Sequence, residues 1–271
     1  MKSVGGRGMR VERRYSRESG GELMVPEYRC TQERYCEDFE VFLECTTQKA
    51  ELLGEVMTLV EELGLHGRFI DVGAGNGALT ARIAPFFRET VAIEPSGPMR
   101  RRLAIRGGAD VVVAERLEEH RRSYEADLVL CSHALFHIPP EEWLWCVRRM
   151  QGWLRPGGQL VLALQSPSSE CMKMLGMFGY QVPSLLEFGR GLVGVEQDEG
   201  RSELGEVRHL GGAVRTGDLE KFLRVVEFQF NCLPHPRAIM RSEVLEYVEA
   251  ELWRHGAFDL GCDQIFVRVA S

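Results

Sequence analysis

The sequence has no uninterrupted apolar stretch as long as a membrane-crossing helix needs, which is about 20 residues. Its eight cysteines include no C-x-x-C pair and no histidine and cysteine spacing of the zinc type, so we expect no metal centre. Several cysteines fall within apolar patterns, where a free thiol acts as a small hydrophobic group, and a reducing cytoplasm is the simplest setting. The formal net charge of −7 argues against nucleic acid as a partner.

The composition is that of an ordinary globular chain, with 44% of the 271 residues hydrophobic and 27% charged. This length suits one domain that carries an insertion, and we expect a monomer. Residues 1–25 combine glycine pairs with scattered arginines and lack apolar periodicity, so they are predicted to be a disordered leader. Met24 is an alternative start, and the arginines also fit an organelle-targeting segment, against which three glutamates count. The folded domain is then 26–271.

The most informative segment runs from Phe69 to Thr80 and has the pattern of a buried strand, a glycine turn and a helix. Gly73, Gly75 and Gly77 carry no side chains where the backbone must bend sharply and approach a ligand closely. Asp71 adds a carboxylate at the end of the strand. A turn of this kind, followed by a helix, is typical of a nucleotide site.

A second strand, Thr90 to Glu94, also ends in an acid, about one helix length after the glycines. In nucleotide-binding α/β folds an acid at this point meets the ribose hydroxyls. The dinucleotide fingerprint G-x-G-x-x-G/A is satisfied as well, through Gly73, Gly75 and Ala78. The glycines alone therefore leave a nicotinamide-dependent dehydrogenase open.

Beyond residue 67, short apolar runs alternate with amphipathic stretches. The predicted strands are Arg68–Val72, Thr90–Glu94, Asp110–Ala114, Ala126–Ser132 and Gly158–Leu164. The predicted helices between them are Ala78–Phe87, Gly97–Arg106, Leu117–Arg122 and Pro140–Leu154. Two further helices, near Tyr35–Leu43 and Ala50–Leu63, precede the first strand. Such alternation is typical of a parallel, doubly wound, Rossmann-like α/β fold.

The alternation stops after Leu164. Residues 165–215 mix a methionine-rich patch with glycines and a polar stretch, which predicts an insertion over the site that contributes to the substrate pocket. Thr216 is the predicted N-cap of a helix that ends at Leu223. The remaining predicted elements are a strand at Val225–Leu233, a helix at Ser242–His255 and a strand at Gln264–Ala270.

The wider pattern resembles the class I S-adenosylmethionine-dependent methyltransferases. Their first motif is similar to Asp71–Gly77 and their second to Ile93–Ser96. Two later signatures are similar to Ala126–Val129 and Leu154–Leu160. The resemblance spans Arg68 to Leu164. It implies an enzyme with a mostly parallel sheet of seven strands, the last one antiparallel, and S-adenosyl-L-methionine as the methyl donor.

The resemblance also implies a set of donor-binding residues, in which Glu94 accepts hydrogen bonds from the ribose hydroxyls. Glu115 or Arg116 would meet the adenine amino group, although both also fit an exposed helix start. The complete implied set is Asp71, Gly73, Ala74, Gly75, Gly77, Glu94, Pro95, Ser96, Met99, Glu115, Arg116 and Ser132.

Outside this core, Tyr35–Gln48 looks like the amino-terminal helix of the histamine N-methyltransferase family, which folds over the active site. This likeness implies an amine or imidazole nitrogen as the methyl acceptor. However, Gln48 stands where that family has a substrate-binding glutamate, and Cys262 lies near the place of its carboxy-terminal asparagine. A neutral Gln48 also suits a carbonyl or hydroxyl group. The predicted substrate-binding residues are Tyr35, Phe39, Phe42, Gln48, Phe136 and Cys262.

His133 and His137 directly follow the fourth predicted strand and are the candidate proton-transfer residues. Both also fit a supporting role beside the adenine. Three functions stay open at this point: N-methylation of a small molecule, O- or C-methylation of a hydroxylated or carbonyl-bearing metabolite, and S-adenosylmethionine binding without turnover. No membrane partner is expected in any of them.

Overall fold

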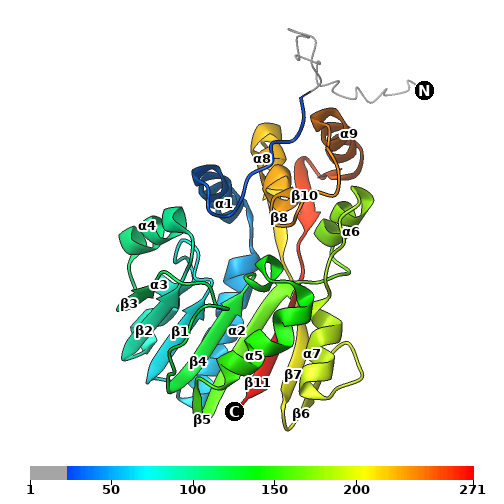
Figure 1. The fold of residues 1–271 in the computed structure, drawn as a ribbon. Coiled ribbons are helices and arrows are strands. Elements are labelled where there is room, and N and C mark those ends of the chain that lie inside the picture. Colours follow the sequence, from blue (N-terminus) through cyan, green and yellow to red (C-terminus); the bar gives the residue numbers. More distant parts are fainter. Residues whose placement is uncertain (1–22) are drawn as a thin grey trace, which may run out of the picture.

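The computed structural model describes residues 23–271, so the predicted leader, 1–25, lies almost entirely outside the described residues. The first described residues already belong to the fold: Met24 forms a β-bridge with Met240, and the Val25 amide donates to the Ile239 carbonyl at 2.8 Å. Among residues 23–271, no helix combines the length and the apolar character that crossing a bilayer requires. Figure 1 shows a large sheet with helices on both faces and a smaller group of elements above one of its edges.

The large sheet has eight strands in the order β3-β2-β1-β4-β5-β11-β7-β6. The first five pair in parallel, and β11 lies antiparallel between β5 and β7. The strands are β1 Arg68–Val72, β2 Glu89–Ile93, β3 Val111–Val113, β4 Ala126–Ser132, β5 Leu154–Gln165, β6 Gly200–Ser202, β7 Gly205–Leu210 and β11 Gln264–Ala270. The seven expected strands become eight, because β6 and β7 come from the predicted insertion while the predicted strand Val225–Leu233 is absent from the sheet.

Alternate residues of each central strand enter two different hydrophobic cores, as the two-residue period of a strand requires. In β4, Leu128 and Leu130 pack into the core beneath one face, and Val129 and Cys131 pack into the core of the other. The first core is covered by α2 (Gln48–Leu63) and α3 (Thr80–Ile83), and the second by α5 (Trp143–Gln151) and α7 (Leu185–Val193). Burial on both faces explains why the sequence of β4 is apolar almost throughout.

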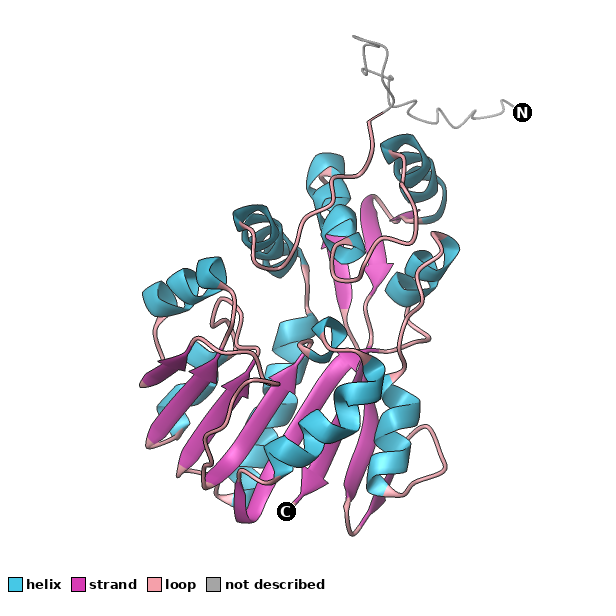
Figure 2. Ribbon diagram, in the orientation of Figure 1, coloured by secondary structure: helices cyan, strands magenta, loops and turns pink. Residues whose placement is uncertain are grey.

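The smaller group of elements, here called the cap, lies where the arrowheads of the parallel strands point (Figure 1). Figure 2 shows that it combines helices with a small sheet of its own. Its members are α1 Glu33–Cys45, α6 Glu170–Met177, α8 Leu219–Phe230, α9 Arg241–Glu251, and the antiparallel strands β8 Ala213–Thr216, β9 Trp253–Arg254 and β10 Ala257–Gly261. These elements share one hydrophobic core, which includes residues of the amino-terminal segment. The cap therefore covers the carboxyl ends of the strands, where open α/β sheets bind ligands.

The predicted strand Val225–Leu233 is wrong, because these residues lie largely in helix α8. The N-cap is Asp218, whose side chain accepts from the Lys221 amide, and not the predicted Thr216. Most residues of the second half of α8 are buried, so the apolar pattern has no free face and resembles that of a buried strand.

Two other predicted helices are shorter or absent. Ala78–Phe87 contains only α3 and a 3-10 turn at Ala84–Phe86. Leu117–Arg122 is not a helix but a single turn, in which the amides of Glu119 and His120 both donate to the Arg116 carbonyl. After that turn the His120 ring stacks on Tyr124, with ring centres 5.6 Å apart.

Residues 165–215, the predicted insertion, divide between the two parts of the molecule. Helix α6 and strand β8 belong to the cap, with Cys171 and Val214 in its core. In contrast, α7, β6 and β7 extend the large sheet and its covering layer.

Helix α4 (Gly97–Arg106) agrees with its predicted bounds, and Ser96 is its N-cap. Pro140–Leu154 becomes a 3-10 turn at Pro140–Glu142 followed by α5. The predicted helix Ser242–His255 corresponds to α9, which ends earlier because residues 253 and 254 form β9.

A buried carboxylate joins the amino-terminal segment to the cap. Asp38 of α1 accepts hydrogen bonds from the Tyr28 hydroxyl at 2.7 Å, from Arg34 Nε at 2.7 Å and from Arg224 Nε of α8 at 2.8 Å. The Asp38 side chain is completely buried. A buried charge with three donors is satisfied, whereas removal of the charge would leave two arginines without the negative group that they pair with.

We expect Asp38→Asn to lower the free energy of unfolding by about 3–5 kcal/mol, the usual cost of breaking a buried ion pair. Chemical denaturation followed by circular dichroism measures this change. The matched control is Glu33→Gln, which breaks exposed ion pairs from the same helix to Arg101 and Arg102 and should cost far less than the loss of Asp38. Equal effects of the two substitutions would contradict a special role for Asp38.

Candidate functional site

The glycine loop after β1 has a backbone that only glycine adopts without strain. Gly73, Gly75 and Gly77 have φ angles of 70°, 57° and 79°. A Cβ atom on Gly73 would lie 2.4 Å from the Cβ of Ala134, and one on Gly77 would lie 3.2 Å from a side-chain carbon of Leu103. The loop is therefore packed against its neighbours, and its bend depends on positions without a side chain.

The carboxylate of Glu94 lies beneath this loop, at the end of β2. Its Oε2 accepts from the Gly75 amide at 2.8 Å and its Oε1 from the Ser96 amide at 2.7 Å. Burial raises the pKa of Glu94, and these two backbone hydrogen bonds oppose the shift. An ionised carboxylate has about four lone-pair positions, so two remain for a ligand with paired hydroxyls.

Asp71 is turned into the protein and not towards the loop surface. Its Oδ2 accepts from the Thr80 hydroxyl at 2.6 Å, and burial raises its pKa to about 6. Asp71 thus ties the strand to the first turn of α3. Ala74, inside the loop, donates its amide to the Ile93 carbonyl at 3.3 Å, so the loop also follows the register of β2.

The residues after Glu94 begin helix α4. The Pro95 carbonyl accepts from Arg100 Nη1 at 2.6 Å. The Ser96 hydroxyl donates to the Cys30 carbonyl at 2.9 Å and accepts from the Met99 amide. The Met99 side chain is buried in the cap core. This turn therefore attaches the amino-terminal segment to the nucleotide loop.

Glu115 and Arg116 follow β3, and their side chains have protein partners. Glu115 Oε2 lies 2.8 Å from His120 Nδ1, and Arg116 is exposed and pairs with Glu118 at 3.2 Å. An adenine contact at this point would use the backbone or require these side chains to change partner.

His133 directly follows β4 and adopts a left-handed conformation, with φ of 57°. Its Nε2 lies 3.0 Å from Gln264 Oε1, while Gln264 Nε2 donates to the Gln48 carbonyl at 2.9 Å. Because the Gln264 oxygen can only accept, His133 Nε2 carries the proton and Nδ1 keeps its lone pair. Burial and the nearby Lys49 lower the pKa of His133 to about 3. The imidazole is neutral and its tautomer is fixed.

The predicted substrate residues of α1 do come together. Tyr35, Phe39 and Phe42 all pack on Phe228 of α8, with ring centres 5.0, 5.7 and 5.5 Å away. The Tyr35 ring also lies 6.2 Å from His137, which is exposed at the end of its short turn. Phe228 was missed from the sequence because it was assigned to a strand.

Helix α1 also covers the nucleotide loop. A Cβ on Gly75 would lie 3.8 Å from the Phe39 ring, and Asn76 Nδ2 donates to Glu40 Oε1 at 2.7 Å. The Glu40 carboxylate also binds Arg106 of α4. The cap and the loop therefore enclose the ends of β1 and β2 from above.

The other predicted substrate residues have different surroundings. Gln48 is buried, and its side-chain amide donates to the Cys262 carbonyl at 3.0 Å. These two residues therefore join the start of α2 to the end of β10. The Phe136 ring lies 6.3 Å from His133 and contacts both the cap core and a sheet core.

Lys49 is a site residue that the sequence did not reveal. It is partly buried, and its Nζ donates to the Ser132 hydroxyl at 3.1 Å, at the end of β4. Burial lowers its pKa to about 8. A lysine next to a predicted substrate residue was the available signal, but a lysine on a helix is usually exposed.

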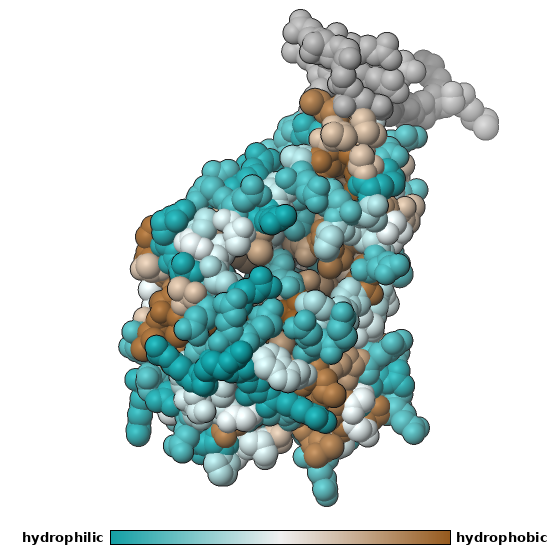
Figure 3. Space-filling view, viewed as in Figure 1, coloured by the Kyte–Doolittle hydropathy of each residue, from teal (hydrophilic) through white to brown (hydrophobic). Residues whose placement is uncertain are grey.

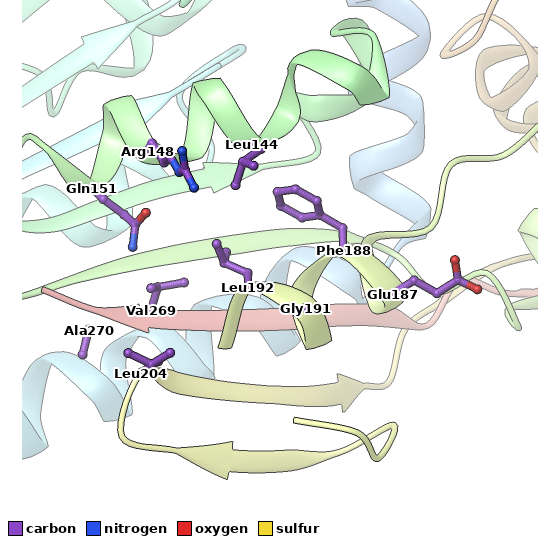
Figure 4. A pocket seen from close by; sticks show the side chains of 10 residues that line it. All are labelled: Leu144, Arg148, Gln151, Glu187, Phe188, Gly191, Leu192, Leu204, Val269 and Ala270. Carbon is purple, nitrogen blue, oxygen red and sulfur yellow. The ribbon is translucent and has the colours of Figure 1, made fainter. Parts of the chain in front are cut away.

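A separate groove of about 610 Å³ lies between α5 and α7. Figure 4 shows Leu144 and Phe188 from the two helices facing each other across it, above Val269 of β11. Hydrophobic residues reach the surface in this region (Figure 3). The groove lies within the layer of helices on one face of the sheet and contains none of the predicted site residues. It is therefore not part of the site at the strand ends.

Residues 46–193 match a family model described as a methyltransferase domain. A protein of Staphylococcus carnosus (strain TM300), described as an uncharacterized methyltransferase, is 29% identical over 139 residues. That alignment covers 51% of this chain and 62% of the relative's own length.

Two solved structures are similar in fold. The Bacillus halodurans C-125 protein BH2331 has a TM-score of 0.54 at 16% identity and covers 79% of this chain and 97% of its own. The Bacillus subtilis protein YcgJ has a TM-score of 0.51 at 14% identity, with 80% and 97% covered.

We expect Gly73→Ala to lower the free energy of unfolding by about 2 kcal/mol or more, because a Cβ must enter both a left-handed backbone and the space of Ala134. Gly54→Ala is the control. Gly54 lies in α2 with nothing near its Cβ position, and alanine should stabilise that helix by about 0.5–1 kcal/mol. Denaturant unfolding of both variants measures the contrast, and a neutral Gly73→Ala would show that the loop is not constrained.

The lowered pKa of His133 predicts how the stability of the fold changes with pH. The pKa is depressed from 6.5 to about 3 in the fold, so the unfolded chain binds the proton first as pH falls. Stability should therefore decrease between pH 6.5 and 3, by up to about 1.4 kcal/mol per unit from this group. His133→Gln should flatten that part of the pH profile, while replacement of the exposed His66 serves as the control for losing an imidazole. Unchanged slopes would contradict the buried, neutral state.

Proposed function

This chain belongs to the methyltransferase-domain family, whose members depend on S-adenosyl-L-methionine, and we propose that it methylates a nitrogen atom of a small amine or imidazole. The observation that carries the donor site is the Glu94 carboxylate, held under the glycine loop by two backbone donors. The nitrogen acceptor is supported by the likeness of Tyr35–Gln48 to an amine-methylating family and by the neutral ring of His133. When bound, the donor supplies an electrophilic methyl carbon on its sulfonium.

We assign the donor to the loop and the end of β2. The backbone of Gly73–Gly77 allows a close approach, and Glu94 would accept both ribose hydroxyls. The remaining predicted donor residues support this arrangement indirectly: Asp71, Ser96 and Met99 hold the strand, the loop and α4 in place. The fit requires no rearrangement of Glu94, because its two backbone donors occupy only part of the carboxylate.

The cap favours a small acceptor. Helix α1 contacts the loop through Phe39 and Glu40, and the aromatic side chains of α1 and α8 form a wall beside it. A polymer would have to displace this helix to reach the donor. We therefore propose an acceptor small enough to be enclosed between the cap and the loop.

His133 favours an acceptor with a hydrogen to donate. Its neutral ring keeps the Nδ1 lone pair, so a neutral N–H group can hydrogen-bond to it and be oriented. We assign His133 this orienting role, because a group with a pKa of about 3 is a weak proton acceptor at neutral pH. We propose a supporting role for His137, which packs beside Tyr35.

Deprotonation of an alkylamine with a pKa near 10.4 costs about 4.6 kcal/mol at neutral pH. The aromatic wall formed by Tyr35, Phe39 and Phe228 lowers this cost, because an apolar surrounding disfavours the ammonium form. An imidazole is neutral at pH 7 and avoids the cost. Alignment of the nucleophile with the methyl carbon contributes about 7–11 kcal/mol, so position outweighs acid–base help.

The decisive experiment incubates the protein with isotope-labelled S-adenosylmethionine and a metabolite extract, and locates the transferred methyl group by NMR and mass spectrometry. An N-methyl product supports the proposal. An O- or C-methyl product would replace it with methylation of a hydroxylated or carbonyl-bearing metabolite. Tight donor binding without any turnover would indicate a regulatory protein instead.

We expect Glu94→Gln to weaken the binding of S-adenosylhomocysteine more than tenfold, since hydrogen bonds to a charged group are worth about 1.5–3 kcal/mol each. Isothermal titration measures the affinity. Glu89→Gln, at the opposite end of β2 in an ion pair with Arg68, is the control and should change it less than about twofold. Equal affinities of wild type and Glu94→Gln would show that Glu94 does not bind the donor.

A further inference from the structure

Lys49 places an ammonium group at the point where the donor site meets the cap. It is the second residue of α2, and its Nζ reaches the Ser132 hydroxyl at the end of β4. Within residues 23–271 it forms no ion pair. Of its three N–H groups, one is used by Ser132, so two are left for another partner.

The groups that face Lys49 come from three parts of the fold. They are the Asp71 carboxylate on β1, Ser132 and the neutral His133 at the end of β4, and the Cys232 thiol after α8. Asp71 is the only carboxylate among them, and it is engaged by the Thr80 hydroxyl. Asp71 is thus the one negative charge near Lys49 in the described part of the chain, but it forms no ion pair with the ammonium, so a ligand carboxylate in direct contact with Nζ would stabilise this partly buried cation further.

We propose that Lys49, together with the Ser132 hydroxyl, binds the α-carboxylate of the methyl donor. The inference rests on the proposed function only in that the donor occupies the glycine loop. Ser132 and the loop lie at the ends of adjacent strands, β4 and β1, so a donor seated on the loop directs its amino-acid end towards Lys49.

Charge balance supports this assignment. A sulfonium and an ammonium repel each other in a site from which water is excluded, and an anion near both removes that repulsion. The donor carries such an anion in its own carboxylate. The amino end of α2, where Lys49 stands, adds the positive end of a helix dipole.

The test compares two ligands that differ only in the carboxylate: S-adenosylhomocysteine and its decarboxylated form. Isothermal titration with wild type and Lys49→Met should show that the substitution weakens S-adenosylhomocysteine about tenfold or more. The decarboxylated ligand should change less than about twofold. Lys173→Met, on the exposed surface of α6, is the matched control and should affect neither ligand.

Lys49→Gln keeps a polar side chain and should reproduce the same selective loss, and thermal unfolding of both variants verifies that they are folded. Equal weakening of the two ligands, or no weakening of either, would overturn the assignment. This outcome is separate from that of the proposed function. Selective loss of S-adenosylhomocysteine binding can occur whatever the methyl acceptor is, and N-methyl transfer can occur without a contact between Lys49 and the donor carboxylate.

The pH dependence gives a second readout. Lys49 has a pKa of about 8, and a bound carboxylate would raise it, so binding is strongest when Lys49 is protonated. The affinity of wild type for S-adenosylhomocysteine should therefore fall as pH rises above about 8, more steeply than that of Lys49→Met. Parallel profiles of the two proteins would count against the assignment, because the amino group of the ligand titrates equally in both.

Discussion

The hydrogen bond from the Gly75 amide to the Glu94 carboxylate joins the ends of two neighbouring parallel strands. The register of β1 with β2 brings these residues together: the amides of Gly73 and Ala74 donate to the Ile93 carbonyl, and the Gly75 amide donates to the Glu94 carboxylate. The loop conformation, the position of the acid and the beginning of α4 therefore depend on one another. Any change that shifts β2 along β1 would displace all three.

The cap is fastened to this corner at several independent points. Asp38 holds α1 to α8, Ser96 holds the amino-terminal segment to the loop, and Gln48 links α2 to the strand end before β11. These contacts are polar and buried, so each needs a specific partner, in contrast to the interchangeable packing of the apolar core. The sheet provides a general nucleotide corner, and the cap provides the side chains around the acceptor.

The parts of the fold that follow local chemistry could be predicted closely. Strands Arg68–Val72, Ala126–Ser132 and Gln264–Ala270 have the predicted bounds, because each apolar run ends at a residue of different character.

The fold class, the methyltransferase family and its S-adenosylmethionine donor are confirmed. Four points stay predictions: the likeness to histamine N-methyltransferases, the identity of the methyl acceptor, the roles of the site residues and the cytoplasmic setting. The second half of helix α8 was missed because burial on all sides hides its period there. Lys49 was missed because its surroundings come from residues about 20 to 180 positions away.

The contact between Asn76 at the tip of the loop and Glu40 of α1 also couples three elements through one side chain. Because Arg106 of α4 binds the same carboxylate, the loop, α1 and α4 meet at a single acidic group. With the donor on the loop as proposed, α1 could not lift away from it without breaking both contacts. The Glu40 carboxylate therefore makes the position of α1 depend on the loop and on α4 together.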